Sequence, residues 1–377
     1  MFEELVSFIR KLKGDQGFIP LHAPVFNGNE RNYVLETIDS TFVSSVGKFV
    51  DRFEEMICEY TGSKFAVATV NGTAALHMAL IGADVSRGEE VITQPLSFVA
   101  TANAISYCGA IPVFIDVDLD TLGMSPESLE SFLKDMTFAK NGVRVNKSTG
   151  SKIAAVVPMH TFGFACRIRE IGEICAKYNI PLVEDSAESI GTKVGGQHTG
   201  TFGKLGIFSL NGNKTITSGG GGAIITNDVK LGKHLKHLTT TAKIPHKWEY
   251  RHDAIGYNYR MPNINAALAC AQLEQLDAFL ISKRELAESY KSFFNNKEVE
   301  FITEIEGTRA NYWLNTIKLK NKEERDEFLS YTNAKNVMTR PIWHLLNDLD
   351  IYKESFIYSM PNAKNLSERV VNLPSSL

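Results

Sequence analysis

Three short segments of the sequence carry side chains that could act together in one chemical site. Asn71-Gly72-Thr73 lies between a strand-like run and a helix-like run, where helix N-terminal amides and a hydroxyl can bind an anion. Asp185 ends the apolar run Pro181–Asp185, so its carboxylate can face a ligand at the end of a strand. Lys214 stands in a turn before four consecutive glycines, with Ser209 five residues before it. Glycine runs let backbones approach one another closely.

Each of these segments also has a purely structural interpretation. A Gly-Thr pair at a helix start is often only a cap, a strand-end carboxylate often caps a loop, and a lysine beside glycines can be exposed in a flexible hairpin. An anion site, a strand-end acid and a lysine 29 residues after that acid together favour pyridoxal phosphate chemistry. Lys214 would form a Schiff base with the aldehyde of this cofactor. The phosphate would lie on the helix N-terminus, and Asp185 would keep the pyridine nitrogen protonated, so that the ring acts as an electron sink.

Other chemical motifs do not match. The segment Asn211–Thr215 looks like the end of a phosphate-binding P-loop, but Asn213 and Phe208 stand where that motif requires glycine. His234 and His237 lack the spacing and the glutamate of a zinc-binding helix. The five cysteines are odd in number and include no Cys-x-x-Cys pair, which argues against a disulfide framework or a zinc cluster. We therefore expect no metal site.

Composition and charge limit the class of protein. The chain has 377 residues, 44% of them hydrophobic and 22% charged, which is typical of a soluble globular protein. Its net charge of −3 means that no overall basic balance would draw the chain to nucleic acid or anionic lipid. No apolar run reaches the ~20 residues that span a membrane, and Glu3 and Glu4 argue against a signal peptide. We expect a cytoplasmic protein, and the cysteine usage fits a reducing compartment.

The elements that must position the three segments alternate along the chain. Apolar strand-like runs alternate with helix-like runs from about residue 35 to residue 240. The expected strands are 64–70, 90–93, 111–117, 153–160, 181–185, 207–210 and 223–226. Short, nearly all-apolar strands between helices predict a mostly parallel sheet that helices cover on both faces. In such sheets the site lies at the carboxyl ends of the strands.

From about residue 260 the pattern indicates a second, smaller unit. Asn263–Tyr290 is one long helical pattern, and the fragments YWLNTIKL and EERDEFLSYT follow it. We therefore predict a large α/β domain at residues 21–250 and a small C-terminal α+β domain at residues 251–377. The polar stretch Lys140–Lys152 is expected to be a surface loop before the fourth strand.

We expect residues 1–20 to form an N-terminal helical extension. Phe2, Leu5, Ile9 and Leu12 recur at helical spacing, as in an amphipathic helix. We expect this helix to dock on its own protein or on a partner subunit, and the alternative is a helix on a membrane surface.

The sequence resembles the DegT/DnrJ/EryC1/StrS family of pyridoxal phosphate-dependent sugar aminotransferases over about residues 24–374. The segments that carry the resemblance are NGTAALHMAL, SFVATANA, PVFIDVD, VEDSAESIG, GTFGKLGIFSLNGNKTITSGGGGAI and GYNYRMPNINAAL. Together these segments are highly specific, although each alone is not. The resemblance implies an α/β fold of the aspartate-aminotransferase-like type (fold type I). Such a fold has a large, mostly parallel, seven-stranded-type α/β/α domain and a smaller C-terminal α+β domain.

The resemblance implies a role for each matching residue. Lys214 matches the Schiff-base lysine, which would also be the catalytic base for the proton shift between C4′ and the sugar carbon, worth roughly 10²–10⁴-fold. Asp185 matches the carboxylate that faces the pyridinium nitrogen, and Phe98 matches the aromatic residue that stacks on the ring. The residues that match the phosphate site are Gly72, Thr73 and Ser209.

Two further positions concern the ring hydroxyl and a second subunit. Glu188 falls where the family has Gln, Glu or His beside the ring hydroxyl. Its negative charge would help there only if the carboxyl is protonated or is aimed at the substrate. Asn258 matches an asparagine that reaches the phosphate from the neighbouring subunit, which implies an obligate homodimer with shared active sites. Asn71 departs from the pattern, because many members have Ser at that position.

The resemblance is strongest to the aminotransferases of the bacillosamine and legionaminic acid pathways. It rests on the early helix, the Asn-Gly-Asn before Lys214, ANYWLN and TRPIWHLL. It implies ping-pong transfer from L-glutamate, through pyridoxamine phosphate, to C4 of a UDP-linked 4-keto-6-deoxy-N-acetylhexosamine. Arg340 and Trp343 are candidates for binding the nucleotide part through charge and aromatic contact. Packing of the small domain is the alternative role for both residues.

Two other functions stay open at this point. The same cofactor could serve another keto-sugar nucleotide, such as a 3-keto sugar, or lyase or dehydratase chemistry, because one fold hosts many reactions. The branch of the family that dehydrates sugars has His in place of this lysine, so Lys214 disfavours it. A non-enzymatic regulator on the same fold is the third function, and it would not require Lys214 and Asp185.

Overall fold

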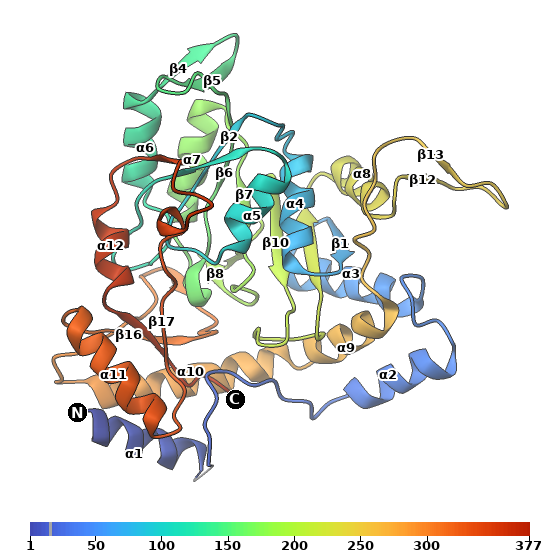
Figure 1. The fold of residues 1–377 in the computed structure, drawn as a ribbon. Coiled ribbons are helices and arrows are strands. Elements are labelled where there is room, and N and C mark those ends of the chain that lie inside the picture. Colours follow the sequence, from blue (N-terminus) through green and yellow to red (C-terminus); the bar gives the residue numbers. More distant parts are fainter. Residues whose placement is uncertain (15–16) are drawn as a thin grey trace.

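The computed structural model describes residues 1–14 and 17–377. A central sheet lies between two layers of helices, and a smaller unit with its own sheet lies beside it (Figure 1). Seven strands of the central sheet each overlap a strand expected from the sequence. They are β1 (Phe65–Thr69), β2 (Glu90–Thr93), β3 (Ile111–Phe114), β6 (Ile153–Val157), β7 (Val183–Asp185), β10 (Leu205–Ser209) and β11 (Gly222–Thr226).

The central sheet is mostly parallel, as the sequence predicts. Its strands form two hydrogen-bonded groups, β3-β2-β6 and β7-β10-β11-β1, with the short strand β18 (Phe356–Ile357) beside β3. Two isolated parallel bridges, Val156–Leu182 and Met159–Asp185, connect the groups. Neighbours pair in parallel except for β11, which is antiparallel to both β1 and β10.

Helices cover both faces of this sheet because both sets of alternating side chains on its strands are apolar. Val67 on β1 and Ile207 on β10 face a cluster with α4 (Gly72–Gly82) and α8 (Val229–Thr239). Their chain neighbours Ala66 and Phe208 face the opposite cluster. The helices of that opposite layer are α3 (Lys48–Thr61), α6 (Pro126–Asp135), α7 (Ile168–Tyr178) and α9 (Asn263–Leu273).

The smaller unit is built around an antiparallel sheet in the C-terminal part of the chain. Its strands, in spatial order, are β14 (Glu300–Phe301), β16 (Asn315–Lys318), β19 (Val370–Leu373) and β17 (Arg340–Pro341). Its helices are α10 (Leu276–Phe294), α11 (Lys322–Ala334) and α12 (Pro361–Ser367). Helix α1 (Phe2–Lys13) docks on this unit, since Leu5 and Ile9 are buried with Phe328 and Val337. The predicted N-terminal helix is therefore confirmed, and it docks on its own chain.

The remaining elements are short or peripheral. They are α2 (Glu30–Asp39), α5 (Ala100–Tyr107), β8 (Lys193–Val194), β9 (Gln197–His198), β12 (Lys243–Ile244), β13 (Arg251–His252), β15 (Thr308–Arg309), η1 (Thr161–Gly163) and η2 (Leu346–Asp348). None of the helices within residues 1–14 and 17–377 combines the length and the apolar character needed to cross a bilayer.

The stretch Lys140–Lys152, expected to be a loop, contains most of a surface hairpin. Strands β4 (Thr137–Lys140) and β5 (Val143–Asn146) pair antiparallel across the turn Asn141-Gly142. Both turn residues have positive φ, 51° and 80°. An Asn-Gly pair is the strongest short hairpin signal because both central residues of such a turn need positive φ. The Asn-Gly pair in the sequence therefore indicates this hairpin, and the expectation of a loop is wrong here.

The long helix expected at Asn263–Tyr290 is two helices. Helix α9 ends at Leu273, and α10 begins at Leu276. At the break, the Gln275 side chain donates a hydrogen bond to the Glu30 carboxylate at 2.6 Å. Helix α9 packs on the central sheet, and α10 continues from it to the smaller unit (Figure 1). A pattern that is locally continuous is therefore broken at a residue that makes a tertiary contact.

Candidate active site

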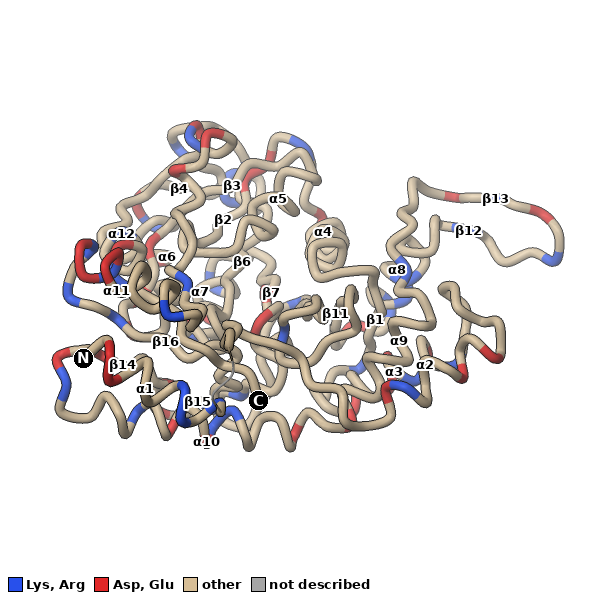
Figure 2. Tube along the Cα trace, turned by 60° about the horizontal axis from the view of Figure 1, so that its bottom comes forward, with Lys and Arg blue, Asp and Glu red and all other residues tan. Residues whose placement is uncertain are grey.

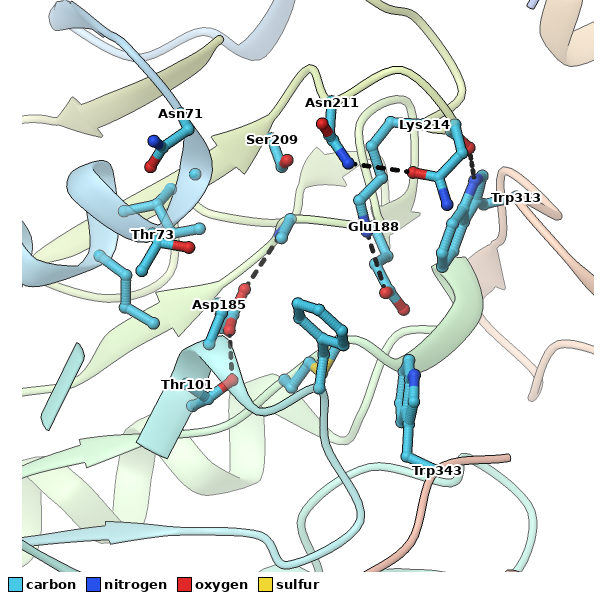
Figure 3. Close-up of a pocket in the computed structure, with 18 residues that line it drawn as sticks. Asn71, Thr73, Thr101, Asp185, Glu188, Ser209, Asn211, Lys214, Trp313 and Trp343 are labelled. Atoms are coloured by element: carbon cyan, nitrogen blue, oxygen red, sulfur yellow. Dashed lines mark hydrogen bonds and ion pairs between the residues drawn. The ribbon is translucent and has the colours of Figure 1, made fainter. Parts of the chain in front are cut away.

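A cavity of about 390 Å³ opens beyond the carboxyl ends of β7 and β10, and Figure 3 shows its lining. Eight residues that the sequence assigns to the site line this one cavity. They are Gly72, Thr73, Phe98, Asp185, Glu188, Ser209, Lys214 and Trp343. Parallel strands that end at one edge of the sheet explain how residues so far apart in the sequence meet.

One wall of the cavity is the N-terminus of α4. The Asn71 side chain caps this helix by accepting a hydrogen bond from the Ala74 amide at 2.7 Å. A Cβ placed on Gly72 would lie 2.8 Å from the Cβ of Ser209, so glycine is required for this approach. The Ser209 hydroxyl thereby lies beside the first amides of the helix, where the helix dipole favours an anion. The donors at this wall fit a phosphate group.

The floor of the cavity holds a buried acid, Asp185, at the end of β7. Thr101 donates a hydrogen bond from its hydroxyl to Oδ2 at 2.8 Å, and the Ala187 amide donates to Oδ1 at 3.2 Å. Burial raises the pKa of Asp185, and these two hydrogen bonds oppose the rise. A cationic nitrogen placed against this carboxylate would be stabilised, and a protonated pyridine nitrogen meets that description.

Lys214 lies across the cavity and contacts a second buried acid. Its Nζ is 3.0 Å from Oε1 of Glu188, and the other oxygen of Glu188 accepts a hydrogen bond from the Phe162 amide at 2.9 Å. Burial raises the pKa of Glu188, and the charge of Lys214 opposes the rise. The lysine amine and Asp185 thus line one cavity whose anion site is at α4 (Figure 3).

Trp313 is a lining residue that we did not predict to belong to the site. Its ring lies 4.0 Å from the Nζ of Lys214, a cation–π contact. Its indole Nε1 donates a hydrogen bond to the carbonyl of Asn213 at 2.7 Å, which ties the small unit to the lysine turn. Trp313 is part of the ANYWLN segment. This segment carries part of the resemblance, but the resemblance gives the tryptophan no role in the site.

Thr101 is a second residue that sequence reasoning missed. Its hydroxyl reaches the Asp185 carboxylate, as described above, and also lies 2.8 Å from the Ser97 hydroxyl. Thr101 stands three residues after Phe98 in the SFVAT segment, at the start of α5. Its place in the same segment as Phe98 was therefore the available signal.

Aromatic rings form the side of the cavity next to the small unit. Phe98 is 50% exposed, which is unusual for such a large apolar side chain, and its ring lies 6.3 Å from that of Trp343. Trp343 packs in turn on Phe162 at 4.8 Å. An exposed ring at a cavity wall can stack on a flat ligand.

Two residues assigned from the sequence lie outside this cavity. Asn258 is exposed, and its side-chain oxygen accepts a hydrogen bond from Arg260 at 3.1 Å. Arg340 donates to the side chain of Asn333 and lines a second cavity of about 550 Å³. This second cavity shares Trp313, Trp343 and Asn213 with the first, so the two spaces adjoin.

A buried lysine supports Trp313 from behind. Lys283 on α10 is 1% exposed, and its Nζ donates to the carbonyls of Trp313 and Ser375 at 3.2 and 2.9 Å. The Nε2 of His22 lies 2.8 Å from the same Nζ. Burial lowers the pKa of Lys283 to about 7.

We expect Lys283 to make stability depend on pH between about 7 and 10. In that range the unfolded chain binds the proton that the folded chain has released, so stability rises with pH by up to about 1.4 kcal/mol per unit. Urea unfolding at pH 7, 8 and 9 measures this slope. Lys283→Met should flatten the slope, whereas Lys291→Met, on the exposed side of the same helix, should leave it unchanged. Equal slopes in wild type and Lys283→Met would contradict the assignment.

Comparisons with known proteins agree with this geometry. The DegT/DnrJ/EryC1/StrS aminotransferase family matches residues 25–377. The chain is similar to the GDP-perosamine synthase of Escherichia coli O157:H7, with 37% identity over 95% of this chain and 93% of that protein. The GDP-perosamine synthase of Vibrio cholerae is also 37% identical, over 95% and 94% of the two chains. The solved structure of the aminotransferase TlmJ from Streptoalloteichus hindustanus superposes with a TM-score of 0.86 at 26% identity, over 95% and 94% of the chains.

Proposed function

This chain belongs to the DegT/DnrJ/EryC1/StrS aminotransferase family, and from that membership we propose that it transfers an amino group to a nucleotide-linked keto sugar. It is a pyridoxal phosphate-dependent enzyme. The observation that carries the proposal is the convergence of the Lys214 amine, the Asp185 carboxylate and the α4 N-terminus on one cavity. When bound, the cofactor supplies an aldehyde and an electron-withdrawing pyridinium ring.

The lining residues fit this cofactor group by group. Gly72, Thr73 and Ser209 would hold the phosphate at the α4 N-terminus, where the absence of a Cβ on Gly72 lets the Ser209 side chain lie beside the first amides of the helix. Asp185 would bind the ring nitrogen, and its buried carboxylate would keep that nitrogen protonated. The exposed ring of Phe98 would lie on the ring face.

Lys214 would both attach the cofactor and act as the catalytic base. Its amine would hold the cofactor covalently through the aldehyde, and the free amine would be the base that moves a proton between the sugar carbon and the cofactor carbon. Glu188 and the ring of Trp313 hold this amine at a fixed place in the cavity. One lysine therefore serves both half-reactions of a ping-pong mechanism.

The acceptor we propose is a nucleotide-linked 4-keto-6-deoxy sugar, with L-glutamate as the amino donor. The segments ANYWLN and TRPIWHLL favour a UDP-linked 4-keto-6-deoxy-N-acetylhexosamine, the acceptor of the bacillosamine and legionaminic acid pathways. Two relatives at 37% identity are named GDP-perosamine synthases, which favours a GDP-linked sugar as the second candidate. The two candidates differ in the nucleotide and in the substituent at C2 of the sugar.

A direct competition decides between these acceptors. The enzyme is incubated with L-glutamate and equal amounts of a UDP-linked 4-keto-6-deoxy-N-acetylhexosamine and a GDP-linked 4-keto-6-deoxyhexose, and mass spectrometry follows the amino sugars formed. We expect one amino sugar to dominate, and its nucleotide identifies the substrate. If L-glutamate still converts the cofactor but neither amino sugar forms, the proposed acceptor class is contradicted.

We propose that the second cavity receives the nucleotide, with Arg340 at the diphosphate and Trp343 in aromatic contact. Arg340→Ala should then raise the KM for the sugar nucleotide about tenfold or more, because a charge-assisted contact to phosphate is lost. Conversion of the cofactor by L-glutamate should keep its wild-type rate, which serves as the internal control. Stopped-flow absorption measures this half-reaction, and steady-state assays measure the KM. A KM that stays at the wild-type value would remove Arg340 from the substrate site.

We also propose that the enzyme is a homodimer with shared active sites. The hairpin of β12 and β13 projects from the body in both views (Figure 1, Figure 2). Trp248, Tyr250 and Ile255 on this projection are 74%, 79% and 86% exposed. Contiguous exposed apolar residues mark interaction surfaces. Asn258 lies six residues after the end of β13, so docking on a second copy would bring it toward the phosphate site of that copy.

The dimer proposal predicts the effect of charge on the projecting hairpin. The double substitution Trp248→Glu and Ile255→Glu should convert the dimer to a monomer and weaken cofactor binding about tenfold or more. Light scattering measures the mass, and cofactor titration measures the affinity. Ile351→Glu, at an isoleucine that is 69% exposed and lies outside the hairpin, should change neither. A wild-type enzyme that is monomeric and fully active would contradict the proposal.

Two further proposals about the whole chain rest on the sequence. We retain the division into an extension at 1–20, a large domain at 21–250 and a small domain at 251–377. The odd number of cysteines without a Cys-x-x-Cys pair favours a reducing compartment, and we therefore place the enzyme in the cytoplasm.

A further inference from the structure

Glu188 is arranged as an ionised carboxylate whose charge is balanced by one lysine. The residue is 2% exposed, and each carboxylate oxygen accepts from one donor, Lys214 at 3.0 Å and the Phe162 amide at 2.9 Å. Figure 3 shows the Glu188–Lys214 contact within the cavity. The ion pair satisfies both charges while the lysine is free.

The surroundings of Glu188 make it dependent on that lysine. Asp185, at the end of β7, is a second acidic group close to Glu188. Its negative charge disfavours the ionised form of Glu188. The η1 turn contributes only the Phe162 amide to the carboxylate, and Trp313 presents an aromatic ring to the lysine. Loss of the Lys214 ammonium would therefore leave a buried carboxylate with a single neutral donor, which burial penalises.

We propose that Glu188 takes up a proton when Lys214 bonds to the cofactor and gives it back when Lys214 is released. This inference rests on the proposed function. As the carbon–nitrogen bond forms, the aldehyde oxygen leaves as water with two hydrogens of the ammonium. The nitrogen keeps one hydrogen and its positive charge, which the phenolate oxygen of the cofactor balances. Glu188 then gains one proton from solvent, and it returns one proton to the freed lysine amine after that amine has completed the proton shift.

The proton exchange explains how a glutamate can serve beside the ring hydroxyl. An ionised carboxylate only accepts hydrogen bonds, and it would repel a phenolate oxygen. A protonated carboxyl donates one hydrogen bond, as the amide of a glutamine side chain does. Glu188 would therefore act as a neutral donor while the cofactor is bonded and as the counter-ion of Lys214 otherwise.

Infrared difference spectroscopy of the full-length enzyme tests this proposal. Spectra are recorded without cofactor, after loading with pyridoxal phosphate, and after addition of L-glutamate. Loading should produce the carbonyl band of one protonated carboxylic acid per active site, and L-glutamate should remove it. The band should shift in enzyme grown with ¹³C-labelled glutamate, which identifies a glutamyl carboxyl without any substitution. The band should also be absent from Glu188→Gln.

Glu54 provides a matched control for Glu188. One of its oxygens pairs with Lys236 at 2.5 Å and the other accepts from the Ala68 amide at 3.0 Å, but Lys236 is not consumed. Glu54→Gln should therefore keep the new band. A band that persists in Glu188→Gln, or that does not shift with labelled glutamate, overturns the proposal.

The failure of this inference and that of the proposed function give different results. Enzyme that gains visible cofactor absorption, responds to L-glutamate and shows no new carboxylic acid band overturns the role of Glu188 alone. Enzyme that gains no visible cofactor absorption overturns the proposed function and this inference together.

Discussion

Replacing Lys214 by alanine should lower kcat for amino transfer by about 10⁴-fold or more. The substitution removes both the amine that bonds to the cofactor and the base that moves the proton, and a positioned base alone contributes roughly 10²–10⁴-fold. Steady-state amino transfer and the visible spectrum of the purified variant measure the effect. The variant should lack the absorption of covalently bound cofactor.

A second lysine separates this effect from a general loss of folding. Lys204 lies just before β10, on the same strand-and-turn segment as Lys214, and it is partly exposed beside Asp84. Lys204→Ala should keep kcat within about twofold of wild type, as surface substitutions usually do. A Lys214→Ala enzyme that retains more than about 1% of wild-type kcat would contradict the assignment.

The second large effect is expected at Asp185. Asp185→Asn keeps the shape, and its single amide oxygen can still accept from Thr101 or from Ala187, but the substitution removes the charge that would hold the ring nitrogen protonated. Breaking a buried charge pair costs about 3–5 kcal/mol, which corresponds to roughly 10²–10³-fold or more in rate. Single-turnover kinetics with L-glutamate measures the rate of the first half-reaction.

The neighbouring hydroxyl provides the matched comparison for Asp185. Thr101→Val leaves the carboxylate in place and removes only its 2.8 Å hydrogen bond, so the rate should fall about tenfold or less. The ordering of the two effects is the test. A larger loss in Thr101→Val than in Asp185→Asn would show that the charge of Asp185 is not what the first half-reaction needs.

The elements of this protein that depend on local residue patterns could be predicted from the sequence. All-apolar runs predicted the strands of the central sheet, and the ends of those runs predicted where Asp185 and the Gly72 turn would meet. The Asn141-Gly142 hairpin was also encoded locally, but it lies in a polar stretch that we had interpreted as a loop. The rule for Asn-Gly turns would have identified it.

The remaining features depend on contacts between distant segments. Trp313 contacts a lysine 99 positions earlier, so no local spacing could place its ring over that amine. The break between α9 and α10 is accompanied by a contact of Gln275 with Glu30, which is 245 residues away in sequence. The pairing of Glu188 with Lys214, on which our further inference rests, likewise required the fold.

The visible absorption spectrum of the wild-type enzyme, recorded with L-glutamate and then with the keto sugar, tests whether Lys214 carries the cofactor through both half-reactions. We expect a yellow enzyme that glutamate bleaches and that a nucleotide-linked 4-keto-6-deoxy sugar makes yellow again. A protein that stays colourless after addition of pyridoxal phosphate would contradict the assignment of Lys214 and, with it, the proposed amino transfer.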